Sequence, residues 1–398
     1  MSGAPTVPGG KSCTQPGFKS IQAALEAPGG GQVVVCPGTY AEQLTITHAT
    51  KLTVAGTAGS AKVVLPASPT ANATKCDEAA TKAGFQADQD EISICEAGTV
   101  SITGLKVEAK WPGSVCYDSL YGIRVAGGST LKATNVTVDG AGAFPINGCQ
   151  GGVGIQAGTT RTTPAESGNV KLKGVTVTNY QKNGITIAGA GSTANISTTT
   201  VVGAGATTQI AQNGIQVSSG AKAKITSSKV SGNECDVESA CGPEGFSQTQ
   251  STGLLFFGAG AGSTVSSSTL SGNDIGAYYI SESKPAPVSP ELVLNKDVFS
   301  GNRYEGVALD QGDALLKSDT INGPGEVGIE IYQYEGQTMA SHSSASKAKI
   351  EGMSEAGVRV SSDKGAKDIP GSFTFAKSTF TGNTTVLNNE SSTFEVIF

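Results

Sequence analysis

The chain has 398 residues, a net charge of −6 and only 15% charged residues, with 54 glycines and two histidines. No basic stripe interleaved with aromatic residues occurs, which argues against nucleic-acid binding, and no apolar run of 18 residues exists that could span a membrane. With only His48 and His342 available, neither a histidine-rich metal site nor a triad centred on histidine is expected.

Eight cysteines occur in the first 241 residues, and none lies in a CxxC pair of the kind that binds metal. The even number predicts disulfides, and the simplest connectivity joins sequence neighbours, although spacing alone leaves other connectivities open. These pairs are 13–36, 76–95, 116–149 and 235–241. Because disulfides persist in oxidising compartments, we expect a secreted, extracellular protein, with a cytosolic protein carrying free thiols as the alternative. No signal peptide is recognisable, and residues 1–15 are expected to form an N-terminal tail.

The first predicted element is a capping helix over residues 17–27. Ile21, Ala24 and Leu25 fall on one face of this helix, and a proline followed by three glycines ends it. An apolar face on an N-terminal helix suits a cap over the first coil of a solenoid, where it prevents strand pairing at the open edge. Strands are predicted next over 32–36, 43–46 and 51–55. An inserted loop is predicted over 66–94.

From residue 122 onward the chain repeats a short phrase, in which glycine is followed by an aliphatic residue, any residue and a second apolar residue. Repeats at intervals of about 22 to 39 residues indicate a solenoid, in which each repeat is one coil. The positions one and three after glycine should face the core, whereas positions two and four should face outward. The nine copies begin at Gly122, Gly154, Gly184, Gly214, Gly253, Gly276, Gly306, Gly328 and Gly357.

Each coil holds three strand-like pieces, as the coil that starts at Gly214 illustrates. Its strands cover 214–217, 223–225 and 228–230, and Ser231-Gly232-Asn233 then turns the chain. Glycine and asparagine tolerate positive φ, which a sharp corner between stacked strands requires. The same Gly-Asn turn recurs at 272–273, 301–302 and 382–383.

These strands and turns resemble the right-handed parallel β-helix of the pectin-lyase-like superfamily, including secreted bacterial proteins with NosD-like repeats. The segments 20–25 and 33–40, with the sequences SIQAAL and VVVCPGTY, strengthen this resemblance at the N-terminal end. The resemblance implies an all-β, single-stranded parallel β-helix forming one domain over 16–398, with three parallel sheets and about 10–12 coils. It says little about activity, because one fold hosts many functions.

In that superfamily the active site usually lies on the outer face of the sheet that the glycine-led strands build, between loops at its two borders. The sequence predicts such loops at 109–121, 140–151, 234–251 and 332–346. The outward positions of the third and fourth copies hold small or uncharged polar residues, namely Thr186, Ala188, Gln216 and Ser218. From the fifth copy onward they include aromatic and charged residues, which suits a sugar-binding groove. We expect a polysaccharide or oligosaccharide to bind there through Phe257, Tyr278, Tyr332, Tyr334, Asp313, Glu335 and Arg359.

Asp310 and Glu330 are the predicted catalytic pair. Aligned by glycine, they lie diagonally on adjacent strands, about 8 Å apart for strands spaced about 4.8 Å. Inverting glycosidases hold their two carboxyl groups about 6.5–9.5 Å apart, one as the acid and the other to activate water. Tyr332 should lie beside Asp310, and Arg359 beside Glu330. The alternative is that two solvent-facing carboxylates and a cross-strand ion pair with Arg359 are purely structural.

The motifs leave the reaction open. The Asn-Thr-Asp, Asp-Asp and Gly-His-Gly elements of polygalacturonases are absent, as is the Asp-Pro-His-Asp element of alginate epimerases. No cofactor or metal is expected, with Ca²⁺ held by Asp310, Asp313 and Glu335 as the alternative. A glycoside hydrolase, transglycosylase or polysaccharide lyase competes with a non-catalytic glycan-binding or adhesion protein and with a structural solenoid. A monomer and a homotrimer are both compatible with the sequence.

Overall fold

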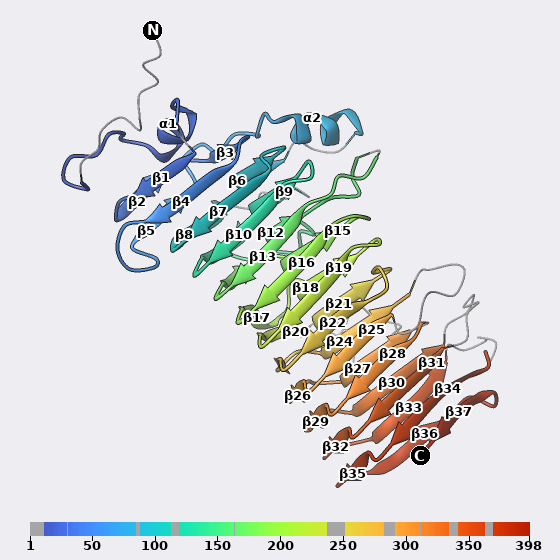
Figure 1. Ribbon diagram of the computed structural model, residues 1–398. Coiled ribbons are helices and arrows are strands. Elements are labelled where there is room, and N and C mark those ends of the chain that lie inside the picture. Colours follow the sequence, from blue (N-terminus) through green and yellow to red (C-terminus); the bar gives the residue numbers. More distant parts are fainter. Residues whose placement is uncertain are drawn as a thin grey trace. The chain divides into compact units, whose positions relative to one another are not determined.

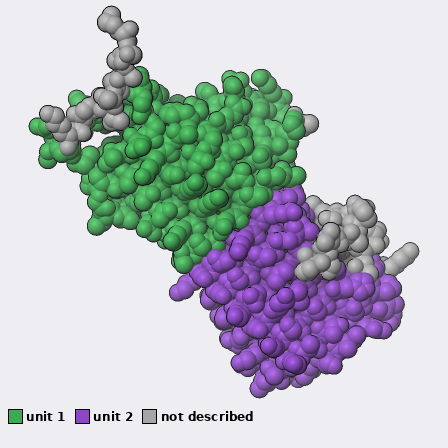
Figure 2. All heavy atoms as spheres, viewed as in Figure 1, with its two compact units in different colours: residues 1–200 green, residues 201–398 purple. Residues whose placement is uncertain are grey.

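The computed structural model describes residues 12–29, 31–84, 88–112, 119–162, 164–236, 251–281, 291–310, 312–333, 341–362 and 369–398. These residues include helices α1 (Ile21–Glu26) and α2 (Lys75–Lys82) and strands β1 to β37, which pair in parallel (Figure 1). The chain divides into two compact units, unit 1 with residues 1–200 and unit 2 with residues 201–398 (Figure 2). The single domain expected over 16–398 stays a prediction.

Unit 1 consists of three parallel sheets, and each coil contributes one strand to each sheet. Sheet 1 has the order β1 (Gln32–Val35), β4 (Thr50–Val54), β7 (Thr99–Thr103), β10 (Thr130–Thr134), β13 (Asn169–Lys173) and β16 (Thr193–Ser197). Sheet 2 has the order β2 (Gly38–Ala41), β5 (Ala61–Val64), β8 (Leu105–Pro112), β11 (Thr137–Phe144) and β14 (Thr176–Tyr180). Sheet 3 has the order β3 (Leu44–Ile46), β6 (Gln89–Cys95), β9 (Leu120–Ala126), β12 (Val153–Ala157) and β15 (Asn183–Ala188).

Unit 2 has the same three-sheet construction. Its sheet 1 contains β19 (Lys222–Thr226), β22 (Ser263–Ser266), β25 (Leu292–Asn295), β28 (Ala314–Lys317), β31 (His342–Ser346), β34 (Gly371–Ala376) and β37 (Phe394–Ile397). Sheet 2 contains β17 (Thr200–Thr207), β20 (Lys229–Cys235), β23 (Thr269–Ser271), β26 (Val298–Ser300), β29 (Thr320–Asn322), β32 (Lys349–Glu351) and β35 (Thr379–Thr381). Sheet 3 contains β18 (Asn213–Ser218), β21 (Thr252–Phe257), β24 (Ile275–Ile280), β27 (Glu305–Asp310), β30 (Val327–Gln333), β33 (Ala356–Ser362) and β36 (Thr385–Asn389).

Sheet 3 is built by the glycine-led strands, and their aliphatic residues fill the core as predicted. Ile155 pairs in register with Ile123 and Ile185, and all three side chains are fully buried. The glycine itself has a packing role. A Cβ at Gly154 would lie 2.5 Å from the carbonyl oxygen of Gly184 and 2.5 Å from a methyl group of a core valine. Glycine therefore heads these strands because the neighbouring coils approach too closely for any side chain.

The Gly-Asn turns of unit 2 use their two residues differently. Gly232 and Gly272 adopt left-handed φ angles of 72° and 59°, as expected for sharp corners. The asparagines do not, which corrects the prediction. Instead the buried Asn233 amide donates to Asn273 at 2.8 Å, and the Asn273 amide donates to Asn302 at 3.1 Å. Stacking places like residues above one another, so the ladder satisfies buried amides that would otherwise destabilise the core.

The N-terminal cap is present but shorter than the predicted helix over 17–27. Ser20 caps α1, and Ile21 and Leu25 bury their side chains against the first coil. The carboxylate of Glu42 accepts the backbone N–H groups of Ile21 and Gln22 at 2.8 and 2.9 Å. Glu42 thereby fastens the helix by satisfying N–H groups that have no partner within the first turn.

The predicted loops are shorter than expected because strands and a helix extend into them. The loop over 66–94 contains α2, whose capping box joins Thr74 and Asp77, and the end of this segment belongs to β6. Strand ends also occupy parts of the predicted loops over 109–121, 140–151, 234–251 and 332–346. The strand ends at 109–112 and 140–144, with the sequences AKWP and GAGAF, contain proline or glycine, which are depleted in strands, so the sequence favours loops there. Pairing of β8 with β11 supplies their backbone hydrogen bonds.

Two of the predicted disulfides are confirmed, Cys13–Cys36 and Cys76–Cys95. Cys149 and Cys235 are also disulfide-bonded, whereas Cys116 and Cys241, their predicted partners, lie outside the described residues. Within the described part of the chain there is no free cysteine. That same part contains no helix long and apolar enough to cross a membrane.

Candidate functional site

The outer face of sheet 3 in unit 2 carries two rows of side chains that run across successive strands. One row holds Leu255, Tyr278, Ala308, Glu330 and Arg359, and the other holds Phe257, Ile280, Asp310, Tyr332 and Ser361. The register confirms that Tyr332 lies beside Asp310 and Arg359 beside Glu330. Asp310 and Glu330 are diagonal neighbours, which corresponds to about 8 Å at ordinary strand spacing.

These two carboxylates are more enclosed than the sequence predicts. Asp310 is 5% exposed and Glu330 is 0% exposed, where solvent-facing positions were expected. Side chains from neighbouring strands cover them. The Nε of Arg359 donates to Glu330 at 2.6 Å, and the hydroxyl of Ser361 also donates to Glu330. A side-chain hydrogen bond joins Tyr278 to Asp310.

Arg359 binds two further carboxylates besides Glu330. Its Nη1 lies 2.7 Å from Glu355, and its Nη2 lies 3.5 Å from Glu305. Glu305 is fully buried and begins β27, directly before Gly306. Glu305 directly precedes the glycine of the repeat and is not one of its two outward positions, so the sequence did not predict that Glu305 contacts Arg359. The available signal was a carboxylate at the head of a strand whose neighbours are largely apolar.

Burial controls protonation in this cluster. Burial raises the pKa of Glu330 to about 7, against the lowering effect of the Arg359 charge and of hydrogen bonds from Ser361 and Arg359. Burial and then the charge of Glu330 hold the pKa of Glu305 well above its usual range. Burial and then the charge of Asp310 raise the pKa of the Tyr278 hydroxyl. A carboxyl group with a pKa near 7 is poised to exchange a proton at neutral pH.

Predicted aromatic residues flank the carboxylates on the same face. Phe257 is 38% exposed, and Tyr278 and Tyr332 are half-buried. Tyr278 and Tyr332 therefore present partly exposed apolar surface near Asp310, and Phe257 adds such surface two strands away in the same row, as a sugar-binding surface requires. Tyr334, which was also predicted to bind substrate, lies outside the described residues.

The alternative calcium site finds no support among the described residues. The carboxylate of Asp313 accepts the backbone N–H of His342 at 2.7 Å, so one of its oxygens holds β31 in place. Glu335 lies outside the described residues. No group of three or more His, Cys, Asp or Glu in the described ranges is placed to hold a metal ion. Binding of Ca²⁺, whose sites need six to eight oxygen ligands, stays a prediction.

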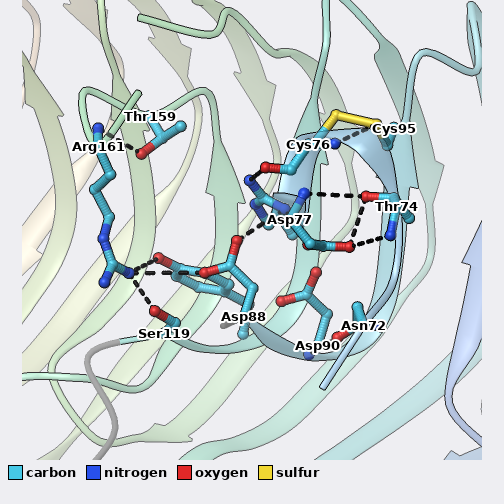
Figure 3. Close-up of polar contacts among 12 residues, drawn as sticks. Asn72, Thr74, Cys76, Asp77, Asp88, Asp90, Cys95, Ser119, Thr159 and Arg161 are labelled. Carbon is cyan, nitrogen blue, oxygen red and sulfur yellow. Dashed lines mark hydrogen bonds and ion pairs between the residues drawn. A yellow bond between two sulfur atoms is a disulfide. The ribbon is translucent and has the colours of Figure 1, made fainter. Parts of the chain in front are cut away.

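Unit 1 contains a second charged cluster on the outer face of sheet 3, which the sequence did not reveal (Figure 3). Arg124 occupies the outward position of the first glycine-led repeat and is only 2% exposed. Its guanidinium lies 2.5 Å from Asp77 and 2.8 Å from Asp88. Arg161 approaches Asp88 from the other side at 3.7 Å. The signals in sequence were Arg124 itself and the acidic stretch that begins at Asp88.

This cluster fastens α2 over the sheet. Asp77 lies in the first turn of α2, and the adjacent Cys76 forms the disulfide to Cys95 at the end of β6. Asp90 is fully buried beside Arg124 but forms no ion pair with a described basic residue. Burial, only partly offset by Arg124, holds the pKa of Asp90 well above its usual range. Because these groups are inaccessible, the cluster supports the fold rather than contacting a substrate.

A cavity of about 560 Å³ lies at the N-terminal end of unit 1. Its lining is mostly apolar and contains none of the predicted site residues. It forms between the first strand and the segment that the Cys13–Cys36 disulfide ties to it. None of its described lining residues carries a charged side chain, so the cavity lacks the carboxylates expected of a glycan-processing site. The cavity is lined in part by Pro16, Phe18, Ile21, Val34 and Tyr40.

Comparison with known proteins identifies the fold. A family model described as a right handed beta helix region matches residues 164–345. No curated protein sequence matches the chain. The chain is a right-handed parallel β-helix, as its sequence predicted.

Several solved structures share this fold at low sequence identity. The catalytic domain of a GH87 α-1,3-glucanase in complex with tetrasaccharides is 13% identical with a TM-score of 0.60, over 96% of this chain and 66% of that one. A periplasmic alginate epimerase is 12% identical with a TM-score of 0.57, over 91% and 78%. The A-module of a mannuronan C-5 epimerase from Azotobacter vinelandii is 12% identical with a TM-score of 0.56, over 94% of both chains. The chain thus spans about two thirds of the glucanase domain.

Proposed function

We propose that this protein is a secreted carbohydrate-active enzyme that cleaves or rearranges glycosidic bonds of a polysaccharide on the outer face of sheet 3 in unit 2. The observation that carries the proposal is the carboxylate pair. Asp310 and Glu330 are diagonal neighbours on adjacent strands, and burial raises the pKa of Glu330 to about 7. A separation of about 8 Å falls in the range that leaves room for a water molecule between the two groups.

The two carboxyl groups take different roles in hydrolysis. Protonated Glu330 donates its proton to the glycosidic oxygen as the bond to the anomeric carbon breaks. Asp310 accepts a proton from the water molecule that attacks that carbon, so one hydroxyl group is formed on each product. Arg359 positions Glu330 through its 2.6 Å contact and tunes its acidity. Phe257 and Tyr332 offer apolar faces against which sugar rings pack.

The structural relatives support a carbohydrate substrate. The glucanase domain that shares the fold was captured with bound tetrasaccharides, and the two epimerases act on alginate or mannuronan by name. Disulfides in both units are consistent with an oxidising, extracellular setting, in which such polymers occur.

A substrate screen with matched variants tests the proposal. Plant, algal and microbial polysaccharides are incubated with the protein and assayed for new reducing ends and for absorbance of unsaturated products. Asp310→Asn and Glu330→Gln should each lower turnover by at least about 100-fold, the range for loss of a general acid or base. Glu355→Gln is the control, because Glu355 is an exposed carboxylate that contacts the same arginine. Full activity in either catalytic variant would refute the assignment.

A non-catalytic glycan-binding or adhesion protein is the second candidate. It is favoured by the complete burial of Glu330 and by the binding of Arg359 to three carboxylates, which a structural ion cluster would also show. The same screen separates the two functions. Measurable glycan binding without any product would favour the second candidate over the enzyme.

A further inference from the structure

The outer face of sheet 1 in unit 1 carries positive charge only. The whole chain has 33 acidic and 27 basic residues, yet the six strands of this sheet contain four lysines and no aspartate or glutamate. The outward residues of β4, β7, β10, β13 and β16 are all lysine, threonine, serine or asparagine, and we call this surface the lysine face. It consists of Lys51, Thr53, Thr99, Ser101, Thr103, Thr130, Lys132, Thr134, Asn169, Lys171, Lys173, Thr193, Asn195 and Ser197.

The lysines of this face are aligned by the strand register. Lys51 pairs with Ser101, Ser101 pairs with Lys132, and Lys132 pairs with Lys171. Lys173 lies two residues further along the same strand as Lys171. All four lysine side chains are exposed. None of them takes part in an ion pair with the acidic residues that the structure describes.

The neighbouring sheet 2 of unit 1 shows the usual arrangement of surface charge. Lys62 and Lys106 lie 3.2 and 2.7 Å from Glu108, and Lys110 lies 3.5 Å from Asp139. On the lysine face, by contrast, Lys132 and Lys171 are adjacent like charges, about 4.8 Å apart along the sheet, and such pairs destabilise a sheet. No acidic residue among the described parts of unit 1 forms an ion pair with them, so their charge is available to attract an anion from solution.

We propose that the lysine face is a docking surface for an acidic polysaccharide, a linear chain of carboxylate-bearing sugars. The row from Lys51 to Lys171 runs across the strands, so an extended polymer laid along it would meet successive ammonium groups. Threonine, serine and asparagine side chains between the lysines donate and accept hydrogen bonds with sugar hydroxyls. The face has no aromatic residue for stacking on neutral sugars and no apolar residue to insert into a membrane, so charge selects the partner.

This proposal is independent of the proposed catalytic pair, because the lysine face lies in unit 1 and on a different sheet from Asp310 and Glu330. Failure of one proposal therefore leaves the other standing. Binding is measured without any requirement for turnover, and turnover on a short soluble oligosaccharide is measured without any requirement for the lysine face.

The test compares two triple variants that remove the same charge from different faces. Lys132→Gln, Lys171→Gln and Lys173→Gln together remove three cations from the lysine face. Lys62→Gln, Lys106→Gln and Lys110→Gln remove three cations from sheet 2, where each is already paired. Affinity electrophoresis and calorimetry measure binding to alginate, to polygalacturonate and to neutral dextran at low and at high salt, and circular dichroism verifies folding.

We expect the unmodified protein to bind the two acidic polymers but not dextran, with affinity that falls as salt rises. The lysine-face variant should bind at least about tenfold more weakly, since three exposed charge contacts are lost. The sheet 2 variant should stay within about twofold of the unmodified protein. Equal loss in both variants, equal binding to dextran, or binding to anionic phospholipid vesicles without binding to acidic glycans would overturn the proposal.

Discussion

Replacement of Arg124 by methionine tests whether the unit 1 cluster holds α2 on the sheet. Arg124→Met keeps the aliphatic length but removes a guanidinium that is 2% exposed and contacts Asp77 at 2.5 Å and Asp88 at 2.8 Å. Two buried carboxylates would then lack their main cation. Breaking a buried ion pair from one side typically destabilises a protein by about 3–5 kcal/mol, because the partner charge stays buried.

The loss should depend on pH in a defined direction. Burial raises the pKa of Asp88 and the charge of Arg124 opposes that rise, so removing the guanidinium should move the pKa of Asp88 further above its unfolded value. A group with a raised folded pKa contributes stability below its unfolded pKa, and that contribution is lost as pH rises through the folded value. The variant should therefore lose more stability relative to the unmodified protein at about pH 8 than at about pH 5.

Two measurements follow the effect, namely thermal unfolding by circular dichroism and hydrogen exchange of the α2 amides, both with the disulfides intact. Faster exchange across α2 is expected, since Asp77 in its first turn loses its partner. Arg303→Met is the control, because Arg303 is 37% exposed and lies 3.6 and 3.9 Å from its two carboxylates. It should change stability by less than about 1 kcal/mol. An Arg124→Met variant as stable as this control, with unchanged α2 exchange, would refute the reasoning.

Three further predictions concern the packing of the coils. Burial raises the pKa of Asp297 to about 6 and that of Asp319 to about 7. Unit 2 should therefore melt at a higher temperature at about pH 5 than at about pH 8, and a melting temperature that rises with pH would contradict this. Gly154→Ala should destabilise the fold by about 1–3 kcal/mol, because its Cβ would lie 2.5 Å from a backbone oxygen; Gly31→Ala, whose Cβ has its nearest neighbour at 3.5 Å, should be nearly neutral in the same denaturation assay. Asn273→Ala interrupts the asparagine ladder and should cost about 1–3 kcal/mol in urea unfolding, since buried amides above and below lose partners.

The repeat in the sequence carried enough information to predict neighbours in space. Parallel stacking places equivalent positions of successive coils side by side, so aligning the glycines predicts that Tyr332 lies beside Asp310 and Arg359 beside Glu330. The same alignment could not predict the Glu305 contact with Arg359, because Glu305 precedes the glycine and lies outside the alternating outward positions.

By itself, the sequence determined the coil, its inward aliphatic ladder and the cap at the N-terminal end, and it favoured the two disulfides between sequence neighbours that the structure bears out. These follow from local rules, namely strand alternation, turn residues and the spacing of cysteines. Only the tertiary structure decided that Glu330 is enclosed, that α2 covers Arg124, and that the lysines of the lysine face form no ion pair with an acidic residue that the structure describes. Burial and charge pairing depend on side chains that extend from other coils and insertions. Local sequence patterns do not predict these contacts, because the contacting residues lie far apart in the chain.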